Sequence, residues 1–534
     1  MSGRAAGRPD WLVAGLVGVL GLAVAAALIR PFEAPTIDPD AAASVLYFER
    51  LTAGQRLEAF VPTTPKPLLT LVYGLTWTAL HDWRALTWET LGVFGLAVGL
   101  AGAWLARVGG SVVPGAGRQR VAAAAAGAFV VTGLIASPDL VLEVSRANSL
   151  VWALGGWLVA GLALTGGRAR PGLAGAALLV AGLTRFETLA LVGVAGLVLL
   201  GRAAAAGLGI GRPAPRRSWL VLIGGLAVPI ACLHDQLLTG DPFFWLGVPA
   251  RYTALYVPGA EALTPLEYGR ILVARYLPGW PLVILVALGL GAAARSRRWI
   301  PLIGLAGFGA GVIVLLFGLA ARGTYISARY YEPLGLVLAA SAAIGVGRLA
   351  SLLTRRGRTT THRVGRLGPV LAVATAAFVA LVVGWPPAPL EPRIERELGL
   401  VRTASANLPV YLPKLTELAG GPVESRPGTG PAGAPLPDPG RVALFVPSLL
   451  RPRIAVETGA SLARLGDTYA SFLARPAWPG LHAGQWIYHD RAADRPDALD
   501  QVLEGDPPVL GRASAEIEFV DGTRGVRILR VARP

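Results

Sequence analysis

The chain has 534 residues, of which 53% are hydrophobic and only 15% are charged, and it carries a formal net charge of +16. A soluble protein would have about a quarter charged residues, so this composition indicates an integral membrane protein. Nucleic acid is not the expected partner, because the arginines lie in short loops between apolar runs and form no basic stripe interleaved with aromatic residues. The single cysteine, Cys232, excludes an intrachain disulfide and a thiolate metal cluster.

Apolar runs recur over the first three quarters of the chain, and about eleven of them approach the ~20 residues that cross a bilayer. They cover residues 11–29, 88–106, 121–136, 150–164, 172–183, 189–206, 219–233, 271–294, 299–320, 331–349 and 367–383. The first run ends without a small-residue cleavage site, which indicates an uncleaved anchor. A shorter run between Lys66 and His81 better suits a helix along the membrane surface. The predicted fold is a mainly α, polytopic transmembrane bundle.

The arginines predict the orientation of this bundle through the positive-inside rule. One set of connections holds Arg107, Arg118, Arg120, Arg168, Arg170, Arg202, Arg212, Arg216, Arg217, Arg295, Arg297, Arg298, Arg348, Arg355, Arg356, Arg358, Arg363 and Arg366. The opposite connections, residues 31–89, 137–148, 234–270 and 322–329, are longer and mix both signs of charge. We therefore expect a multi-pass cell-membrane protein with a cytoplasmic N-terminus. With an odd number of spans, everything after Trp385 is extracytoplasmic.

The last part of the chain has a different composition. A proline-rich stretch opens it at residues 386–389, a Gly/Pro-rich linker follows at 427–439, and short strand-like runs lie at 442–446, 486–488, 516–520 and 526–531. We therefore expect two domains. Residues 1–385 form the transmembrane domain with a large first outer loop (31–89), and residues 386–534 form a small extracytoplasmic α/β domain.

Polar residues in the first outer loop are the first candidates for chemistry. Asp38 and Asp40 flank a proline, and such a pair can act as a general base or hold a divalent cation, although Asp and Pro also favour ordinary turns. Lys66 is one of two lysines in an arginine-rich chain, the other being Lys414. A compact ammonium at the membrane face suits a phosphate group, and the alternative is a snorkelling interfacial lysine.

Later outer connections add further candidates. Glu143 and Arg146 are spaced to pair on a helix. Arg185 and Glu187 are two residues apart and cannot face each other on one helix, so they need a polar cavity or a short extramembrane turn.

Two more clusters complete the set. His234 and Asp235 could transfer a proton or bind metal, or be merely interfacial. Arg329, followed by two tyrosines, could bind a phosphate or be a snorkelling member of an aromatic belt. No Walker sequence is present, so an ATP-driven pump is not expected.

Together these motifs resemble the GT-C superfamily of polytopic membrane glycosyltransferases, which includes the protein O-mannosyltransferases, the aminoarabinose transferase of lipid A and oligosaccharyltransferase catalytic subunits. The resemblance rests on Asp38-Pro39-Asp40, the run from Tyr47 to Gly54, Pro65-Lys66-Pro67-Leu68, Leu183-Thr184-Arg185-Phe186-Glu187, Thr239-Gly240-Asp241-Pro242-Phe243 and Arg329-Tyr330. The chain departs from the family pattern where Leu68 directly follows Lys66-Pro67 and where Phe186 replaces a proline.

The resemblance implies transfer of a sugar from a polyprenyl-phosphate donor to a glycan, lipid or protein acceptor on the outer face, with inversion at the anomeric carbon. Asp40, or else Asp38, would deprotonate the acceptor, and Lys66 and Arg329 would hold the donor phosphate. Glu143, Glu187, Arg185, His234 and Asp235 are candidates to orient the acceptor or bind metal. No cofactor is required by the sequence, and a divalent cation stays an open option.

Two alternatives remain at this stage. A flippase or secondary transporter for a lipid-linked sugar would place charges in mid-span and show paired repeats, whereas these charges gather at the outer ends of spans. An inert membrane scaffold with a glycan-binding tail is the second alternative.

Overall fold

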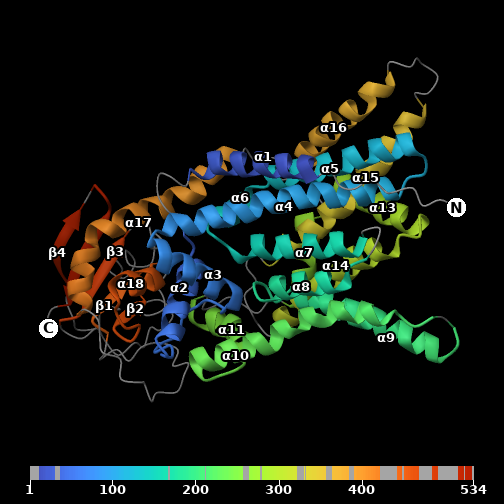
Figure 1. The fold of residues 1–534 in the computed structure, drawn as a ribbon. Coiled ribbons are helices and arrows are strands. Elements are labelled where there is room, and N and C mark those ends of the chain that lie inside the picture. The colour runs from blue at the N-terminus through green and yellow to red at the C-terminus, as the bar shows by residue number, and fades with distance from the viewer. Residues whose placement is uncertain are drawn as a thin grey trace.

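The computed structural model describes residues 11–30, 37–165, 169–210, 212–256, 264–276, 280–321, 330, 332–356, 364–383, 390–420, 442–447, 450–467, 484–490, 515–521 and 523–531. Over these residues the protein is mainly helical, with a small sheet near the C-terminus. Figure 1 shows long helices running side by side, with the sheet at one end of the bundle. The predicted fold class is confirmed.

Each predicted span coincides with helical structure. The bundle consists of α1 (Trp11–Ile29), α4 (Trp83–Ser111), α5 (Ala116–Ala136), α7 (Ser149–Thr165), α8 (Pro171–Gly182), α9 (Thr188–Gly207), η1 (Arg216–Leu226) with α10 (Ala227–Thr239), α13 (Trp280–Arg295), α14 (Trp299–Ala321), α15 (Glu332–Arg356) and α16 (Val364–Val383). By length and composition, six of the described helices could cross a membrane, or seven if the bent pair α6 (Pro138–Ser145) and α7 is one span. Shorter apolar helices include α8, α13 and parts of α1 and α16.

One predicted span is described only in part. Helices α12 (Pro265–Tyr276) and α13 cover residues 271–276 and 280–294 of the span predicted at 271–294, and residues 277–279 lie outside the described residues.

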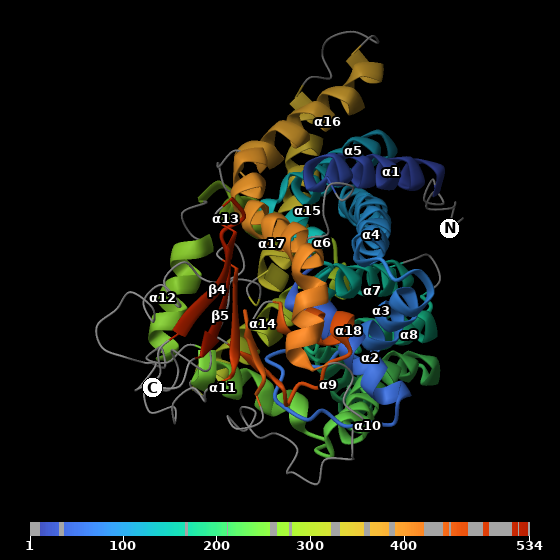
Figure 2. The same cartoon turned by 90° about the vertical axis from the view of Figure 1, so that its left-hand side faces the viewer.

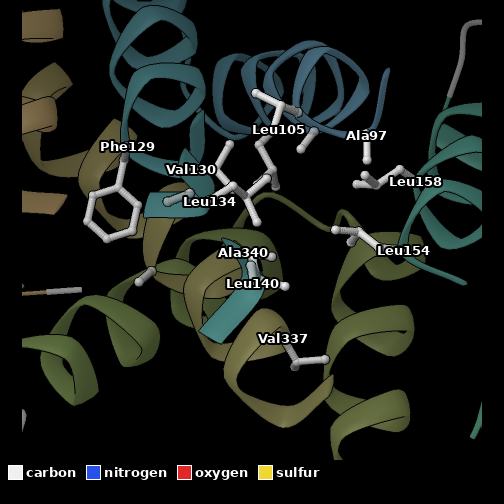
Figure 3. Packing of buried hydrophobic residues seen from close by; sticks show 14 of the residues in the cluster. Ala97, Leu105, Phe129, Val130, Leu134, Leu140, Leu154, Leu158, Val337 and Ala340 are labelled. Carbon is white, nitrogen blue, oxygen red and sulfur yellow. The ribbon is translucent and has the colours of Figure 1, made fainter. Parts of the chain in front are cut away.

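The bundle core is apolar and contains many small residues. Figure 3 shows Val130 and Leu134 of α5 near Leu105 of α4, and these residues belong to one buried cluster with Phe129 of α5 and Val337 of α15. At the crossing of α13 and α15, a Cβ atom on Gly289 or on Gly345 would collide with the backbone of the other helix. Glycine is needed there because close approach of two helix backbones leaves no room for a side chain.

Two further helices lie at the end of the bundle that carries the sheet. The first is α2 (Pro39–Thr52), which begins with proline at its first position and is capped by the side chain of Asp38. The second is α3 (Pro67–Leu80), which covers the apolar run that was predicted as a surface helix. On the same side, α11 (Phe244–Tyr256) follows α10 after a tight turn at Gly240, whose φ is +81°.

The C-terminal region contains α17 (Leu390–Ala419), α18 (Arg451–Thr458) and a five-stranded sheet in the order β2-β1-β3-β5-β4. Its strands are β1 (Leu444–Val446), β2 (Leu465–Asp467), β3 (Trp486–Asp490), β4 (Ala515–Asp521) and β5 (Val526–Val531). β2 and β3 pair with β1 in parallel, and β3, β5 and β4 pair in antiparallel fashion. The four predicted strand regions are present. Strand β2 was not predicted, because Leu-Gly-Asp is too short to give an alternating pattern.

The C-terminal region shares a hydrophobic core with the first outer loop. Tyr47 and Leu69, from α2 and α3, belong to the same buried cluster as Leu408, Ile454 and Tyr488. Figure 2 shows α17 and α18 close to α2 on the side that carries the sheet. The segment predicted as the first outer loop and the C-terminal region therefore pack as one layer at this end of the bundle, here called the outer layer after the predicted orientation.

Candidate active site

A cavity lies between this outer layer and the ends of the bundle helices, and it encloses about 800 Å³ including its open mouth. Its described lining consists of Asp40, Pro62, Thr64, Lys66, Asn148, Ser149, Thr184, Arg185, Phe186, Glu187, Val248, Pro249, Tyr252 and Tyr330. Four of the predicted site residues, Asp40, Lys66, Arg185 and Glu187, are therefore brought together although they are up to 147 positions apart in the sequence (187 − 40).

The cavity is lined by the starts of four helices. Asp40 lies in the first turn of α2, Lys66 is the N-cap of α3, Asn148 and Ser149 begin α7, and Glu187 is the N-cap of α9. A helix N-terminus presents unpaired N–H groups and carries about half a positive charge. Four such ends around one cavity favour an anionic ligand.

The Asp40 carboxylate contacts Lys66 and Thr63 in the cavity wall. Its Oδ2 atom lies 2.8 Å from Lys66 Nζ, and its Oδ1 atom accepts a 3.0 Å hydrogen bond from the Thr63 hydroxyl. Both charged side chains are largely buried, with 11% of Asp40 and 12% of Lys66 exposed. Asp40 and Lys66 thus form an ion pair that is shielded from water but open to the cavity.

Arg185 and Glu187 form a second ion pair, in the turn between α8 and α9. Nη2 of Arg185 lies 2.5 Å from Oε1 of Glu187, and Nε lies 3.2 Å from both carboxylate oxygens. On a helix, residues two positions apart point to different sides and could not pair. Residues 183–187 form a turn instead of a helix, and this turn brings the side chains of Arg185 and Glu187 together.

Electrostatics keep the Glu187 carboxylate ionised. Burial would raise the pKa of Glu187, but the guanidinium of Arg185 and the more distant ammonium of Lys66 hold it below its ordinary value. The effect of Lys66 on Glu187 links the two ion pairs, so the cavity wall is a connected array of two cations and two carboxylates.

The segment that carries Lys66 is fixed by contacts on three sides. Tyr47 donates a 2.7 Å hydrogen bond to the carbonyl of Thr63, and the Leu68 N–H donates to the carbonyl of Leu183. Burial, with Asp40 and Asp235 nearby, raises the pKa of Tyr47 well above its ordinary value, so its hydroxyl stays protonated as a donor. Thr63 therefore joins Tyr47 to Asp40, accepting a hydrogen bond through its backbone and donating one through its side chain.

The same segment is also attached to the C-terminal region. Arg451 on α18 is almost completely buried and donates to the carbonyls of Phe60, Leu462 and Leu465 at 3.0, 3.0 and 2.9 Å. A second contact joins Ser461 to Glu58. The outer loop that shapes the cavity is thus fastened to residues almost 400 positions away.

Asp38 has a structural position beside the cavity. Its Oδ1 atom accepts a 2.8 Å hydrogen bond from the Asp40 N–H and so caps α2, and its own N–H donates to the carbonyl of Arg146. It is not among the described lining residues of the cavity. Asp38 is therefore placed to orient Asp40. Of these two aspartates, Asp40 is the one whose carboxylate faces the cavity.

The remaining sequence candidates lie elsewhere. Glu143 is buried in α6, with 5% exposed. His234 and Asp235 were expected in an outer loop, but they lie within α10, whose helix continues to Thr239. Asp235 accepts a 2.7 Å hydrogen bond from the Trp245 N–H and so ties α10 to α11. Arg329 lies outside the described residues, whereas its neighbour Tyr330 lines the cavity.

Several lining residues were not predicted. Asn148 caps α7 by accepting a 3.0 Å hydrogen bond from Leu150 N–H, at the point where α6 and α7 meet at a bend of 113°. An Asn-Ser pair before an apolar run is a helix-start signal that could have identified this end. Phe186, noted only as a departure from a motif, stacks on Trp245 with ring centroids 4.1 Å apart and gives the cavity an aromatic wall.

A divalent cation would need carboxylates with oxygens to spare. Within the described part of the chain, no group of three or more His, Cys, Asp or Glu side chains is arranged to hold a metal ion. The two carboxylates in the cavity wall each have a cationic partner, Lys66 for Asp40 and Arg185 for Glu187. This donor set fits a paired electrostatic site better than a metal centre.

The chain was compared with protein families, curated proteins and solved structures. No family model matches the chain, and no curated protein matches it. The chain is similar to the crystal structure of the Archaeoglobus fulgidus oligosaccharyltransferase in the apo form, with 12% sequence identity and a TM-score of 0.49 over 95% of this chain and 73% of that one. The proposed function therefore rests on the residues that line the cavity and not on this likeness.

Proposed function

We propose that the protein is an integral membrane glycosyltransferase of the GT-C type that transfers a sugar from a polyprenyl-phosphate donor to an acceptor at the extracytoplasmic face. The observation that carries the proposal is the Asp40–Lys66 ion pair, 2.8 Å long, in a cavity lined by the starts of four helices. A base, a phosphate-binding cation and helix N-termini that face the leaving phosphate are the groups that this reaction needs.

The donor phosphate fits the positive side of the cavity. Lys66 and Arg185 supply full charges, and the N-termini of α3 and α7 supply partial ones. The apolar helices α7 and α9 begin at this cavity, so a lipid in the bilayer could reach it without leaving the membrane. In the proposed site Arg329 is a third cation toward the phosphate, beside Tyr330.

Asp40 is the proposed general base. When the donor phosphate binds, it competes with Asp40 for Lys66, and Asp40 is released to accept a proton. The acceptor hydroxyl loses its proton to Asp40 as its oxygen attacks the anomeric carbon from the side opposite the phosphate. The bond from that carbon to the phosphate oxygen breaks, polyprenyl phosphate leaves with the electron pair, and the anomeric configuration is inverted. Lys66 and the helix N-termini stabilise the charge on the leaving phosphate.

The aromatic wall is the proposed position of the donor sugar. Phe186 lines the cavity next to Arg185 and Glu187, and Trp245 supports its ring from behind. An apolar ring face contacts the C–H face of a sugar, while neighbouring charged groups bind its hydroxyls. In this scheme side chains balance the phosphate charge, so transfer should persist in the presence of a chelator.

The test uses membrane vesicles supplied with polyprenyl-phosphate sugars that carry a radioactive sugar, and follows incorporation into membrane and envelope fractions. Asp40→Asn should lower transfer by a factor of about 10² to 10⁴, as expected for loss of a general base. Asp241→Asn is the matched control, because this carboxylate lies in the nearby loop after α10 but is not part of the described cavity lining. Wild-type turnover by Asp40→Asn would remove Asp40 from the mechanism.

The same vesicles separate this function from the alternatives. A flippase would move the lipid-linked sugar between leaflets without consuming it, and a scaffold would leave the sugar on its carrier. Transfer that depends on Asp40 excludes both, whereas movement between leaflets without incorporation would replace the proposal with transport.

A further inference from the structure

A second hollow, here called the outer groove, lies between the α3–α4 corner and the C-terminal region. It encloses about 730 Å³ including its open side and is lined by Trp77, His81, Asp82, Trp83, Arg84, Ser405, Ala406, Pro409, Arg453 and Glu457. It shares none of its lining residues with the cavity that contains Asp40. Helix α3 joins the two, with Lys66 at its start and His81 at its end, so its 14 residues separate the sites by about 20 Å.

Aromatic rings form the floor and one side of the groove. Trp77 and Trp83 lie with centroids 4.2 Å apart, and His81 lies 5.6 Å from Trp77. Trp83 is buried and donates a 2.7 Å hydrogen bond to Glu457, while the guanidinium of Arg453 lies over its ring at 5.5 Å. This floor is held by packing and hydrogen bonds, so it is formed before any ligand arrives.

The charges around the groove cancel. Arg453 is paired with Glu457 at 2.6 Å within α18, and Asp82 and Arg84 lie at its exposed edge. Two arginines face two acids, so the groove has no net attraction for a phosphate headgroup or for a cationic peptide. The half-buried ring of Trp77, beside paired donors and acceptors, instead suits a neutral ligand with many hydroxyl groups.

His81 lies at the lining edge of the groove. Its φ is +49°, in the left-handed region, at the C-cap of α3 where glycine or asparagine is usual. A solvent-exposed imidazole is therefore kept at the mouth of the groove, at a position where glycine would be the easier residue.

We infer that the outer groove binds a neutral oligosaccharide. The inference rests on the proposed function for its biological meaning, because a groove on the same outer layer as the cavity would hold a glycan acceptor while its end reaches Asp40. The inference itself is tested by glycan binding alone, because binding at the groove requires neither the sugar donor nor the transfer reaction.

The test measures binding of the purified full-length protein in detergent to an array of neutral glycans, followed by titration of the best ligand. His81→Gly is the first variant, because glycine accepts the positive φ and removes only the imidazole. Arg84→Gln is the second, and Arg56→Gln is its matched control, since Arg56 is another exposed arginine of the outer layer that does not line the groove.

The expected result is binding to at least one neutral glycan, weakened by a factor of three or more (about 0.7 kcal/mol) in His81→Gly and Arg84→Gln and unchanged in Arg56→Gln. Absence of any neutral glycan ligand would overturn the inference, as would equal binding by His81→Gly and the wild type. Binding of inorganic phosphate or anionic lipid headgroups in place of glycans would also overturn it. Glycan binding by a protein that shows no sugar transfer would support this inference and overturn the proposed function.

Discussion

Arg451 on α18 donates a 3.0 Å hydrogen bond to the carbonyl of Phe60, joining the C-terminal region to the loop that leads into Thr63 and Lys66. Arg451 as a whole residue is 2% exposed, and its guanidinium also donates to the carbonyls of Leu462 and Leu465. These three acceptors of the buried guanidinium are all backbone carbonyls, so its hydrogen bonds form only while the loop that carries Phe60 keeps its position. The C-terminal region therefore acts as a brace for the cavity wall.

Replacement of Arg451 by methionine tests this brace. The change leaves three buried carbonyls without a donor, at roughly 1–3 kcal/mol each, so we expect a clear fall in the thermal unfolding temperature in detergent. Transfer should fall as well, because the Phe60–Lys66 segment loses its fixed position. Arg530→Met is the matched control, since Arg530 is exposed on β5, and it should leave both quantities near wild type. Full activity in a folded Arg451→Met protein would contradict the brace.

The coupling of Lys66 and Asp40 can be measured with a double-mutant cycle. Lys66→Met leaves the Asp40 carboxylate largely buried without its cation, which should destabilise the protein by about 1–3 kcal/mol for a pair that is partly exposed. Asp40→Asn in the same chain should recover most of that loss, because the uncompensated charge is gone. Unfolding temperatures of the four proteins give the coupling, and additive effects would show that the pair is not an interacting unit.

Activity separates the two roles of this pair. Lys66→Arg keeps the positive charge but replaces a compact ammonium with a planar fork, so we expect partial transfer with a raised KM for the donor. Lys66→Met should lose both donor affinity and turnover. Equal KM values in wild type and Lys66→Met would place the donor phosphate elsewhere.

The local chemistry of this site was readable from the sequence, but its assembly was not. Asp40 and Lys66 stood out because an acidic pair and a rare lysine follow the first apolar run, and Arg185 and Glu187 because charges at a span end need a polar surrounding. The contact of Arg451 with Phe60 joins positions 391 residues apart, and no periodicity or spacing reports such a contact. The same holds for Asn148 and Ser149, whose role depends on where the bend between α6 and α7 points.

Glu49 on α2 provides a pH-dependent contribution to stability. Burial raises its pKa from 4.5 to about 6, against the opposing effects of Arg50 and Trp77. Between these values the folded protein binds the proton more tightly than the unfolded chain, so this contribution is complete below pH 4.5 and is lost as the pH rises through about 6. The unfolding temperature of the wild type, compared with that of Glu49→Gln, should therefore decrease as the pH is raised from 4.5 to about 6. Glu417→Gln, at an exposed position, should follow the wild type throughout.

The predicted orientation of the bundle in the membrane can be tested by labelling two exposed positions at its opposite ends. Lys414 lies on α17 beside the sheet, whereas Arg202 lies near the end of α9, which Figure 1 shows at the far end of the bundle. In a Cys232→Ser background, cysteine at position 414 should react with a membrane-impermeant maleimide on intact cells, because the positive-inside rule puts the basic loops in the cytoplasm. Cysteine at position 202 should react only after permeabilisation. The reverse pattern would place the cavity on the cytoplasmic side and would exclude an outer-face acceptor.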